Sequence, residues 1–374
     1  MLRRAIAGWI PAEANVWTPA VLVVLVVLSA CGADTGVETA TPDAADEEIE
    51  SPTAEPIRVL AGGAHLSTPA VAIDESGIVF VAWVDGLTAD AHVMHRYLSP
   101  GRGWSEAEML SEGFEYNGSP KLLVDPRGSV CVFWHASVPE AGLYERCFGE
   151  DGWGAAETAV EPRGLTAGFA PAFAPDGSTV AAHEIPPSFI GFGDTALTVE
   201  GVTAGAPAFA VDSAGGFHVV WTQFADQAEE SGMVYRSSND GGATWSELER
   251  LDPTGLLTHD LVADGHGNVH WLHVDGTYRR WTPTDGWSQP AETDGGGRLA
   301  VDGDGRAWAV FPGIDGVSLA ERQDDGAWSD ARLVEPTAGG PVDAAVLAID
   351  PAGVFHLVYV TSGEESAITY LSLP

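Results

Sequence analysis

The sequence predicts an all-β fold, a seven-bladed β-propeller of four-stranded antiparallel blades, and three observations predict it. A short apolar run, an acid, a glycine turn and a second apolar run recur seven times, with successive acids 36 to 52 residues apart. Four short strands per repeat of this length are typical of a propeller blade. The last repeat has only three strands, whereas a spare strand precedes the first repeat. The acids are Asp74, Asp125, Asp176, Asp212, Asp264, Asp302 and Asp350.

Composition supports a folded domain and excludes one class of partner. The chain has 374 residues, of which 45% are hydrophobic and 13 are tryptophan, and this is enough for a sizeable core. It carries 54 acids against 17 bases, and Lys121 is its only lysine. A net charge of -37 repels phosphate backbones and anionic lipid headgroups, so we expect no nucleic-acid partner. We expect the protein to be a monomer.

The N-terminus predicts export. Two arginines precede the apolar run Ala20 to Leu28, which is too short for a mature membrane-spanning helix and suits the apolar part of a secretory signal. The run ends in LSACG at 28–32, which resembles the lipobox of bacterial lipoproteins. This resemblance implies a lipoprotein signal peptide over 1–30 and lipidation of Cys31. The alternative is a plain secretory signal.

Residues 31–56 predict a disordered acidic tether. The stretch 33–56 has eight acids and no base, and it has almost no large apolar group. Such a segment cannot bury enough apolar surface to offset the entropy of ordering. We therefore expect the propeller to span 57–374 and to lie outside the cytoplasm in a bacterial cell envelope. It would contact a membrane through the lipid anchor only, at the outer membrane or the cell surface.

Each repeat begins with a predicted hairpin. The first unit, PAVAIDESGIVFVAW from Pro69 to Trp83, contains an inner strand, a turn led by Asp74 and a second strand. At such a turn the carboxylate accepts hydrogen bonds from amides ahead of it, while glycine takes a positive φ. In the third unit, the stretch DGST at 176–179 is expected to shorten the turn by two residues. The second strands end in Trp83, Trp134, His183, Trp221, His273, Phe311 and Tyr359.

A third strand follows in most repeats, and then a turn and a tryptophan. Clear examples of the strand are MHRYLS at 94–99 and MVYRSS at 233–238. A small residue comes directly after each tryptophan, and a fourth short strand completes the blade. The tryptophans are Trp104, Trp153, Trp245, Trp287 and Trp328.

One of these turns, SSNDGGATWSE at 237–247, matches the Asp-box found in bacterial sialidases and many other propellers. The matching residues are Ser238, Asp240, Gly242, Thr244 and Trp245. The resemblance implies that the turn joins the third and fourth strands on the outer rim, away from the ligand-binding face. The aspartate would bond turn amides and the tryptophan would wedge between blades. We therefore predict a structural role for the turn and assign no catalytic residue.

The first strand is expected to close the ring. The stretch PIRVLAGG at 56–63 precedes the first repeat where a fourth strand would, and the last repeat, ending in ITYLSLP, lacks one. An open ring would leave both strand edges free to aggregate. Pairing of the N-terminal strand with the last blade removes both edges.

Two cysteines of the second repeat predict a disulfide. Cys131 lies on the second strand and Cys147 on the third, at equal distances from Pro139 in the loop between them. A hairpin centred on that loop sets the two cysteines opposite one another, and export permits oxidation. The alternative is a pair of buried thiols.

The candidate ligand site lies over the central channel, on the face where inner strands begin and second strands end. Most repeats have a small or apolar residue near the start of the inner strand, but Lys121, Asp260 and Arg298 are charged. With His259 they form a predicted polar mouth. The aromatic ends of the second strands would either stack on sugars at this rim or pack between blades. The loop candidates are Tyr116, His135 and Glu184, with His65, Glu115, Asn117 and Asp275 nearby.

The sialidase resemblance covers the fold but not the active-site motif. Sialidases hold a carboxylate with three arginines, the first of which lies in a Phe/Tyr-Arg-Ile-Pro motif. The nearest match here is PIRVL with Arg58, which lacks that order and falls on an expected outer strand. Sialidases also have six blades, whereas this chain has seven repeats.

Two classes of function remain. No zinc, calcium, phosphate-loop or dinucleotide motif is found, so no metal and no cofactor is expected. The sequence favours a lipid-anchored, non-enzymatic binding module for a glycan or a protein at the channel mouth. The alternative is a glycoside hydrolase of the exo-sialidase type, which would need two carboxyl groups roughly 5–10 Å apart. Binding is favoured because no acid, nucleophile and base stand at matched blade positions.

Overall fold

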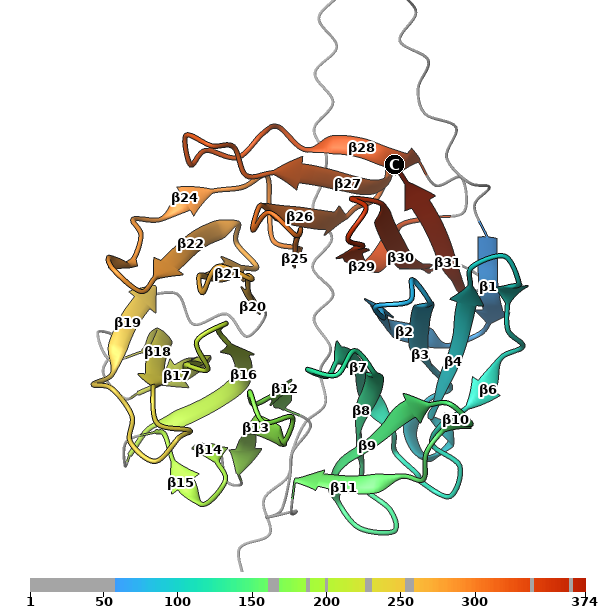
Figure 1. Cartoon of the computed structure of the whole chain (residues 1–374), viewed down its shortest axis with the longest axis horizontal. Coiled ribbons are helices and arrows are strands. Elements are labelled where there is room, and N and C mark those ends of the chain that lie inside the picture. Colours follow the sequence, from blue (N-terminus) through green and yellow to red (C-terminus); the bar gives the residue numbers. More distant parts are fainter. Residues whose placement is uncertain are drawn as a thin grey trace, which may run out of the picture. The chain divides into compact units, whose positions relative to one another are not determined.

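The repeated hairpins form a ring of seven antiparallel sheets around a central channel (Figure 1). The structure is a computed structural model that describes residues 58–160, 168–185, 189–198, 201–225, 231–252, 259–336, 340–362 and 366–374. The expected signal peptide, Cys31 and the acidic tether lie outside the described residues. The predicted seven-bladed propeller is confirmed.

In each blade the first strand lies at the channel and the following strands lie successively further out (Figure 1). Blade 1 contains β2 (Leu66–Ile73), β3 (Val79–Asp85), β4 (His92–Ser99), β5 (Gly103–Trp104) and β6 (Glu108–Met109), with the 3-10 turn η1 (Thr88–Asp90). Blade 2 contains β7 (Gly118–Val124), β8 (Val130–Ala136), β9 (Gly142–Gly149), β10 (Gly152–Trp153) and β11 (Glu157–Val160). Blade 3 contains β12 (Phe169–Phe173), β13 (Thr179–Ile185), β14 (Phe189–Phe192) and β15 (Thr195–Ala196).

The remaining four blades repeat this order. Blade 4 contains β16 (Thr203–Val211), β17 (Phe217–Phe224), β18 (Gly232–Ser238) and β19 (Glu249–Asp252). Blade 5 contains β20 (His259–Ala263), β21 (Val269–His273), β22 (Thr277–Thr282), β23 (Gly286–Trp287) and β24 (Ala291–Glu292). Blade 6 contains β25 (Arg298–Val301), β26 (Ala307–Pro312), β27 (Gly316–Glu321) and β28 (Arg332–Pro336). Blade 7 contains β29 (Val342–Ile349), β30 (Phe355–Thr361) and β31 (Ser366–Leu373), and β1 (Arg58–Gly63) completes it.

The N-terminal strand closes the ring as predicted. β1 pairs antiparallel with β31, with Arg58 opposite Tyr370 and Gly63 opposite Ser366. Leu60 on β1 is only 5% exposed and packs in one apolar cluster with residues of blades 1 and 7. Arg58 is therefore on the outer strand of the last blade, as the sequence predicted.

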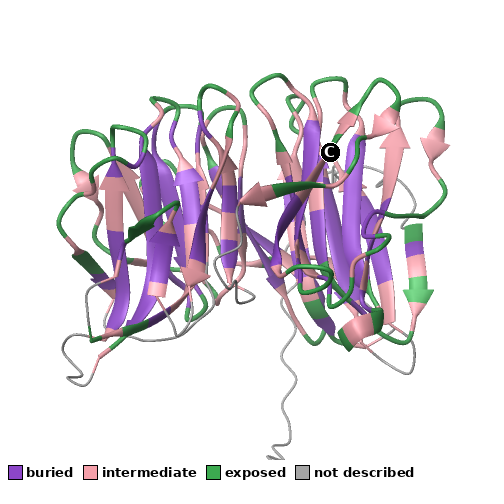
Figure 2. Cartoon of the chain, turned by 90° about the horizontal axis from the view of Figure 1, so that it is seen from below, coloured by how far each residue is buried: buried purple, intermediate pink, exposed green. Residues whose placement is uncertain are grey.

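The second strand of each blade is deeply buried, because neighbouring blades cover both of its faces. Figure 2 shows buried segments running through the middle of the strands and exposed loops at both ends. Trp83, Trp134 and Trp221 are 1%, 0% and 0% exposed. The suggestion that these aromatic strand ends stack on sugars is therefore wrong, since each indole is enclosed between blades.

Each tryptophan after a third strand packs edge-on against an aromatic ring of the preceding blade. The ring centroids lie 4.9 to 5.3 Å apart, a distance at which edge-to-face pairs are favourable. The wedging expected from sequence thus joins neighbouring blades. The pairs are Trp104 with Tyr370, Trp153 with His95, Trp245 with Phe192, Trp287 with Tyr235 and Trp328 with Tyr278.

The turn between first and second strands has the same length in all seven blades, so the expected shortening in blade 3 is wrong. Asp74 N–H donates to the carbonyl of Ile78 in blade 1, and Ala174 N–H donates to that of Ser178 in blade 3. Alanine takes the first turn position in blade 3, and Asp176 lies two residues later, where it binds Ser178. In the other six blades the aspartate accepts hydrogen bonds from the amides two and four residues ahead.

The turn 238–245 links β18 to β19 and is held by its own side chains. The Ser238 hydroxyl donates to the Asp240 carboxylate at 2.7 Å, and Thr244 donates to it through its amide and its hydroxyl at 2.9 and 2.6 Å. These bonds, those from Thr244 above all, lower the pKa of Asp240 to about 2. Gly242 has a φ of +88°, and a Cβ there would lie 2.5 Å from the Phe192 ring.

Cys131 on β8 and Cys147 on β9 are direct register partners, and their sulfurs form a disulfide bond. The bond joins residues 16 apart in sequence, a loop length for which constraint of the unfolded chain stabilises by about 3 kcal/mol. Both strands belong to blade 2, so the crosslink fixes the hairpin whose inner neighbour, β7, carries Lys121.

Candidate functional site

The central channel holds a cavity of about 550 Å³ lined by the inner strands β2, β7, β20, β25 and β29. Most of the lining side chains are apolar, such as Ala70, Leu122 and Leu347. In this described wall the charged residues are Lys121, Asp260 and Arg298 alone. The same three residues also line a second cavity of about 160 Å³ on the side of blades 3 and 4.

The three charged residues stand at one level of the channel because they occupy equivalent places in their blades. Their partners on the second strands are Phe133 for Lys121, Leu272 for Asp260 and Val310 for Arg298. Each partner is the eighth residue after the turn aspartate of its own repeat. The repeat thus brings together three residues that are 139 and 38 positions apart in sequence.

A β-bulge lies immediately before Lys121 on β7. The register with β8 slips by one residue between Gly118 and Lys121, and Ser119 takes a φ of +50° ahead of Pro120. Proline is tolerated here because the inner strand is a sheet edge with no further strand on the channel side. The same bulge occurs at Thr68 and Ala206, each followed by proline. The sequence already contained this signal as three X-Pro pairs at equivalent places.

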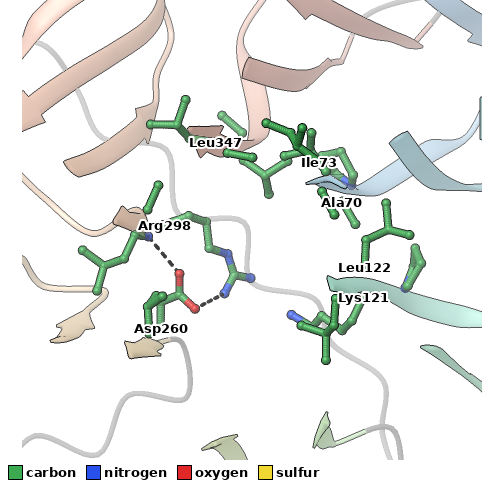
Figure 3. A pocket seen from close by; sticks show the side chains of 18 of the residues that line it. Ala70, Ile73, Lys121, Leu122, Asp260, Arg298 and Leu347 are labelled. Carbon is green, nitrogen blue, oxygen red and sulfur yellow. Dashed lines mark hydrogen bonds and ion pairs between the residues drawn. The ribbon is translucent and has the colours of Figure 1, made fainter. Parts of the chain in front are cut away.

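Asp260 is held by the backbone and by Arg298. Its Oδ2 accepts the Leu299 amide of the next blade at 2.8 Å, and its Oδ1 lies 3.9 Å from the Arg298 guanidinium (Figure 3). The carboxylate therefore ties blade 5 to blade 6. Figure 3 shows the Arg298 guanidinium between the Asp260 carboxylate and the Lys121 amine.

The ammonium group of Lys121 is disfavoured by its surroundings in the channel. Burial above all, together with the charge of Arg298, lowers the pKa of its amine to about 8, while Asp260 acts in the opposite direction. The ammonium form still predominates at neutral pH. The channel thus presents two cations and one anion within a protein whose net charge is -37.

Of the other sequence-predicted site residues, Tyr116, His135 and Glu184 are not among the residues that line the channel. Tyr116 is 49% exposed in the loop before β7, and His135 lies on β8 with its Nε2 buried and no hydrogen-bond partner among the described residues. Burial lowers the pKa of His135. Glu184 accepts the Ala206 amide at 2.7 Å and so joins blades 3 and 4. His259 starts β20 opposite His273, and its side chain is outside the described part of the chain.

Three Asp–His–Tyr chains on the opposite side of the blades have residue types that often serve in catalysis. His218, His270 and His356 each bond a tyrosine of the third strand through Nδ1 at 2.7 to 2.8 Å. Their Nε2 atoms face the turn aspartates at 3.1 to 3.6 Å. The histidines are only 0% to 8% exposed, so they cross-link turns within the blades. The members are Asp212, His218 and Tyr235, Asp264, His270 and Tyr278, and Asp350, His356 and Tyr370.

Neither a metal centre nor a membrane span is found in the part of the chain that the structure describes. No group of three or more histidine, cysteine, aspartate or glutamate side chains there is arranged to hold a metal ion. Among the same residues, no helix has the length and apolar character needed to cross a membrane.

Comparison with known proteins bears on the fold. No protein-family model matches the chain, and no curated protein matches it. A protein of unknown function from Dyadobacter fermentans DSM 18053 matches with a TM-score of 0.53 and 14% identity, over 84% of this chain and 98% of that one. The seven sheets define the chain as a seven-bladed β-propeller. At 14% identity, the match with the Dyadobacter protein shows a similar fold and nothing about function.

Two enzymes are also among the similar solved structures. The Hadza microbial sialidase Hz136 matches with a TM-score of 0.49 and 12% identity, over 82% of this chain and 65% of that one. The chain thus spans less than two thirds of that sialidase. The polysaccharide lyase Uly1 matches with a TM-score of 0.48 and 10% identity, over 81% of this chain and 89% of that one.

Proposed function

We propose that this protein is a lipid-anchored, extracytoplasmic binding module that holds its ligand at the channel mouth and works without catalysis. The observation that carries the proposal is the small number of charged residues that line the channel, namely Lys121, Asp260 and Arg298. Sialidases use a tyrosine nucleophile, and no tyrosine lines the described channel wall. Most other glycoside hydrolases place two carboxyl groups across the scissile bond. The described channel wall supplies one, Asp260, which is bonded to the Leu299 amide and lies beside Arg298.

A protein partner fits the channel face better than a glycan does. Sugar-binding faces commonly use exposed aromatic rings, but the tryptophans nearest this face are buried, and Tyr116 and Phe224 are the two aromatic side chains among the exposed large apolar residues of its described loops. The loops around it instead expose apolar residues, which mark protein-binding surfaces when they gather on one face. These residues are Leu87 at 57%, Tyr116 at 49%, Val138 at 37%, Phe224 at 39%, Val274 at 39% and Ile314 at 81% exposed.

Site-specific photo-crosslinking of the full chain tests this face. A photoreactive side chain at Ile314 or Val274 is expected to give a discrete crosslinked product in cells that make the protein natively. The matched controls are Val59 and Leu333, which are 59% and 48% exposed on outer strands. Equal products from all four positions would contradict a dedicated channel face. Release of fluorophore from a panel of glycosides by the purified chain would favour the sialidase-like alternative instead.

Metabolic labelling with a lipid analogue tests the anchor. The full chain is expected to incorporate the label and to fractionate with membranes, whereas Cys31→Ser is expected to lose the label. Cys131→Ser is the matched control, because this residue lies in a blade and not in the export segment. An unlabelled wild-type protein released into the medium would contradict the anchor and favour the plain secretory signal.

A further inference from the structure

We infer that Lys121 and Arg298 form a binding site for a carboxylate group attached to an apolar body. The inference rests on the proposed function, since it names the chemical group that the channel mouth would hold. Two sources share this chemistry: a small organic acid, and the C-terminus of a protein that ends in an apolar residue.

The first argument is that the two cations have no adequate acceptors in the protein. Neither the Lys121 ammonium nor the Arg298 guanidinium donates a hydrogen bond to any residue that the structure describes, and the one ion pair, Arg298 with Asp260, is long at 3.9 Å. An ammonium has three donors and a guanidinium has five. Both groups therefore have donors available for an acceptor that enters the channel.

The second argument is electrostatic. Two like charges that share a partly buried channel repel one another, and burial weakens their solvation. Asp260 neutralises one of them, and its Oδ2 is already occupied by the Leu299 amide. A single negative charge from a ligand completes the balance. A carboxylate suits this place because it can meet the planar guanidinium with one edge and the compact ammonium with a remaining lone pair.

The third argument is the apolar wall, which selects the rest of the ligand. Beside the three charged groups, the channel is lined by side chains such as Ala70, Leu122 and Leu347 (Figure 3). Its cavity of about 550 Å³ is in the size range of small-molecule sites. A hydrated inorganic anion would leave this apolar surface uncovered. An alkyl or branched group next to the carboxylate would cover it.

The single lysine provides a direct probe. In the full chain labelled with ¹³C-lysine, Lys121 gives the only lysine Cε resonance, and its pH titration reports the state of this site. Hexanoate is expected to raise the apparent pKa of Lys121 by at least one pH unit and to bind at least tenfold more tightly than acetate. Hexanamide, the neutral analogue, is expected to leave the titration unchanged. Inorganic phosphate controls for a site that accepts any anion.

Variants locate the second cation. Arg298→Gln is expected to weaken hexanoate binding at least tenfold while the Lys121 resonance remains observable. Arg306→Gln is the matched control, since Arg306 pairs with Glu321 away from the channel. An unchanged Lys121 titration in hexanoate would overturn the inference. Equal binding of hexanoate, acetate and phosphate would show an adventitious ion only and would also overturn it.

Two peptides separate the sources of the carboxylate. If the ligand is the C-terminus of a protein, an N-acetylated tetrapeptide that ends in leucine is expected to compete with hexanoate when its C-terminal carboxylate is free. The same peptide with an amidated C-terminus is expected not to compete. Competition by small acids alone would assign the site to a metabolite. If the chain gives crosslinks at Ile314 but does not bind hexanoate, the carboxylate site is refuted and the proposed binding module is not. Hexanoate binding without any crosslink would refute the protein-binding face instead.

Discussion

Replacement of Leu60 by aspartate is expected to lower the free energy of unfolding by about 3 to 5 kcal/mol, because it places an unpaired charge in an apolar cluster. Leu60 is 5% exposed on β1 and packs with Val358 and Ile368 of the last blade. Its carbonyl also accepts the Arg96 guanidinium of blade 1 at 3.0 Å. The strand that closes the ring is thus fixed from both neighbouring blades.

The adjacent residue supplies the control for this prediction. Val59 is on the same strand but 59% exposed, so Val59→Asp is expected to change stability by no more than about 0.5 kcal/mol. Urea unfolding followed by tryptophan fluorescence measures both variants. Loss of β1 would also uncover the edge of β31, so Leu60→Asp is expected to self-associate in size-exclusion chromatography. Equal unfolding midpoints for the two variants would show that β1 does not close the ring energetically.

Asp264→Ala is expected to lower the free energy of unfolding by about 3 to 5 kcal/mol, because it removes a buried carboxylate that accepts hydrogen bonds from several donors. Asp264 accepts the amides of His266 and Asn268, the Asn268 side chain at 2.7 Å and His270 Nε2 at 3.2 Å. Asp74→Ala is the matched control at the equivalent turn of blade 1. There the bonded groups are exposed or half-buried, and a loss of about 1 kcal/mol is expected.

The same network predicts destabilisation by acid. Burial works to raise the pKa of Asp264, but the bonds from His270, Asn268 and His266 outweigh it and hold that pKa well below its usual range. Burial lowers the pKa of His270, and Asp264 only partly opposes this. Above about pH 6.5 the neutral imidazole donates Nε2–H to the carboxylate in the folded protein.

The direction of the effect follows from proton uptake. As the pH falls below about 6.5, the unfolded chain protonates this histidine while the folded protein resists it, so stability decreases. The depressed pKa of Asp264 extends the loss, because its contribution is present above about pH 4 and disappears further into acid. His218 and His356 also have lowered pKa values, so three chains act together. A urea midpoint that is the same at pH 7.5 and pH 5 would contradict this prediction.

The local rules of the repeat made much of the fold predictable. In six blades a turn aspartate bonds amides two and four residues ahead, and the recurrence of an acid and a glycine between two apolar runs revealed seven units. Ring closure followed from a count of strands, and the opposition of Cys131 and Cys147 followed from the symmetry of one hairpin. The three charged channel positions were also predictable, because equivalent places in the repeat lie at equivalent levels of the channel.

Contacts between distant segments were not predictable in this way. The tyrosines of the three Asp–His–Tyr chains lie 17, 8 and 14 residues after their histidines, because the loops between second and third strands differ in length. Glu184 looked like a rim residue, yet it binds the Ala206 amide of the next blade. In blade 3 the aspartate moved by two residues within an unchanged turn, since the turn backbone can be held by its own amides and carbonyls.

The sequence by itself determined the number of blades, their strand order and the identity of the charged residues at the channel, because these depend on local hydrogen bonds and on periodicity. Only the tertiary structure decided which side chains remain accessible. Trp83 is enclosed because a neighbouring blade covers it, while Lys121 and Arg298 face the channel without adequate acceptors. The burial of a side chain and its hydrogen-bond partners depend on how neighbouring blades pack around the axis. These contacts join residues that are far apart in the chain, so local sequence patterns do not reveal them.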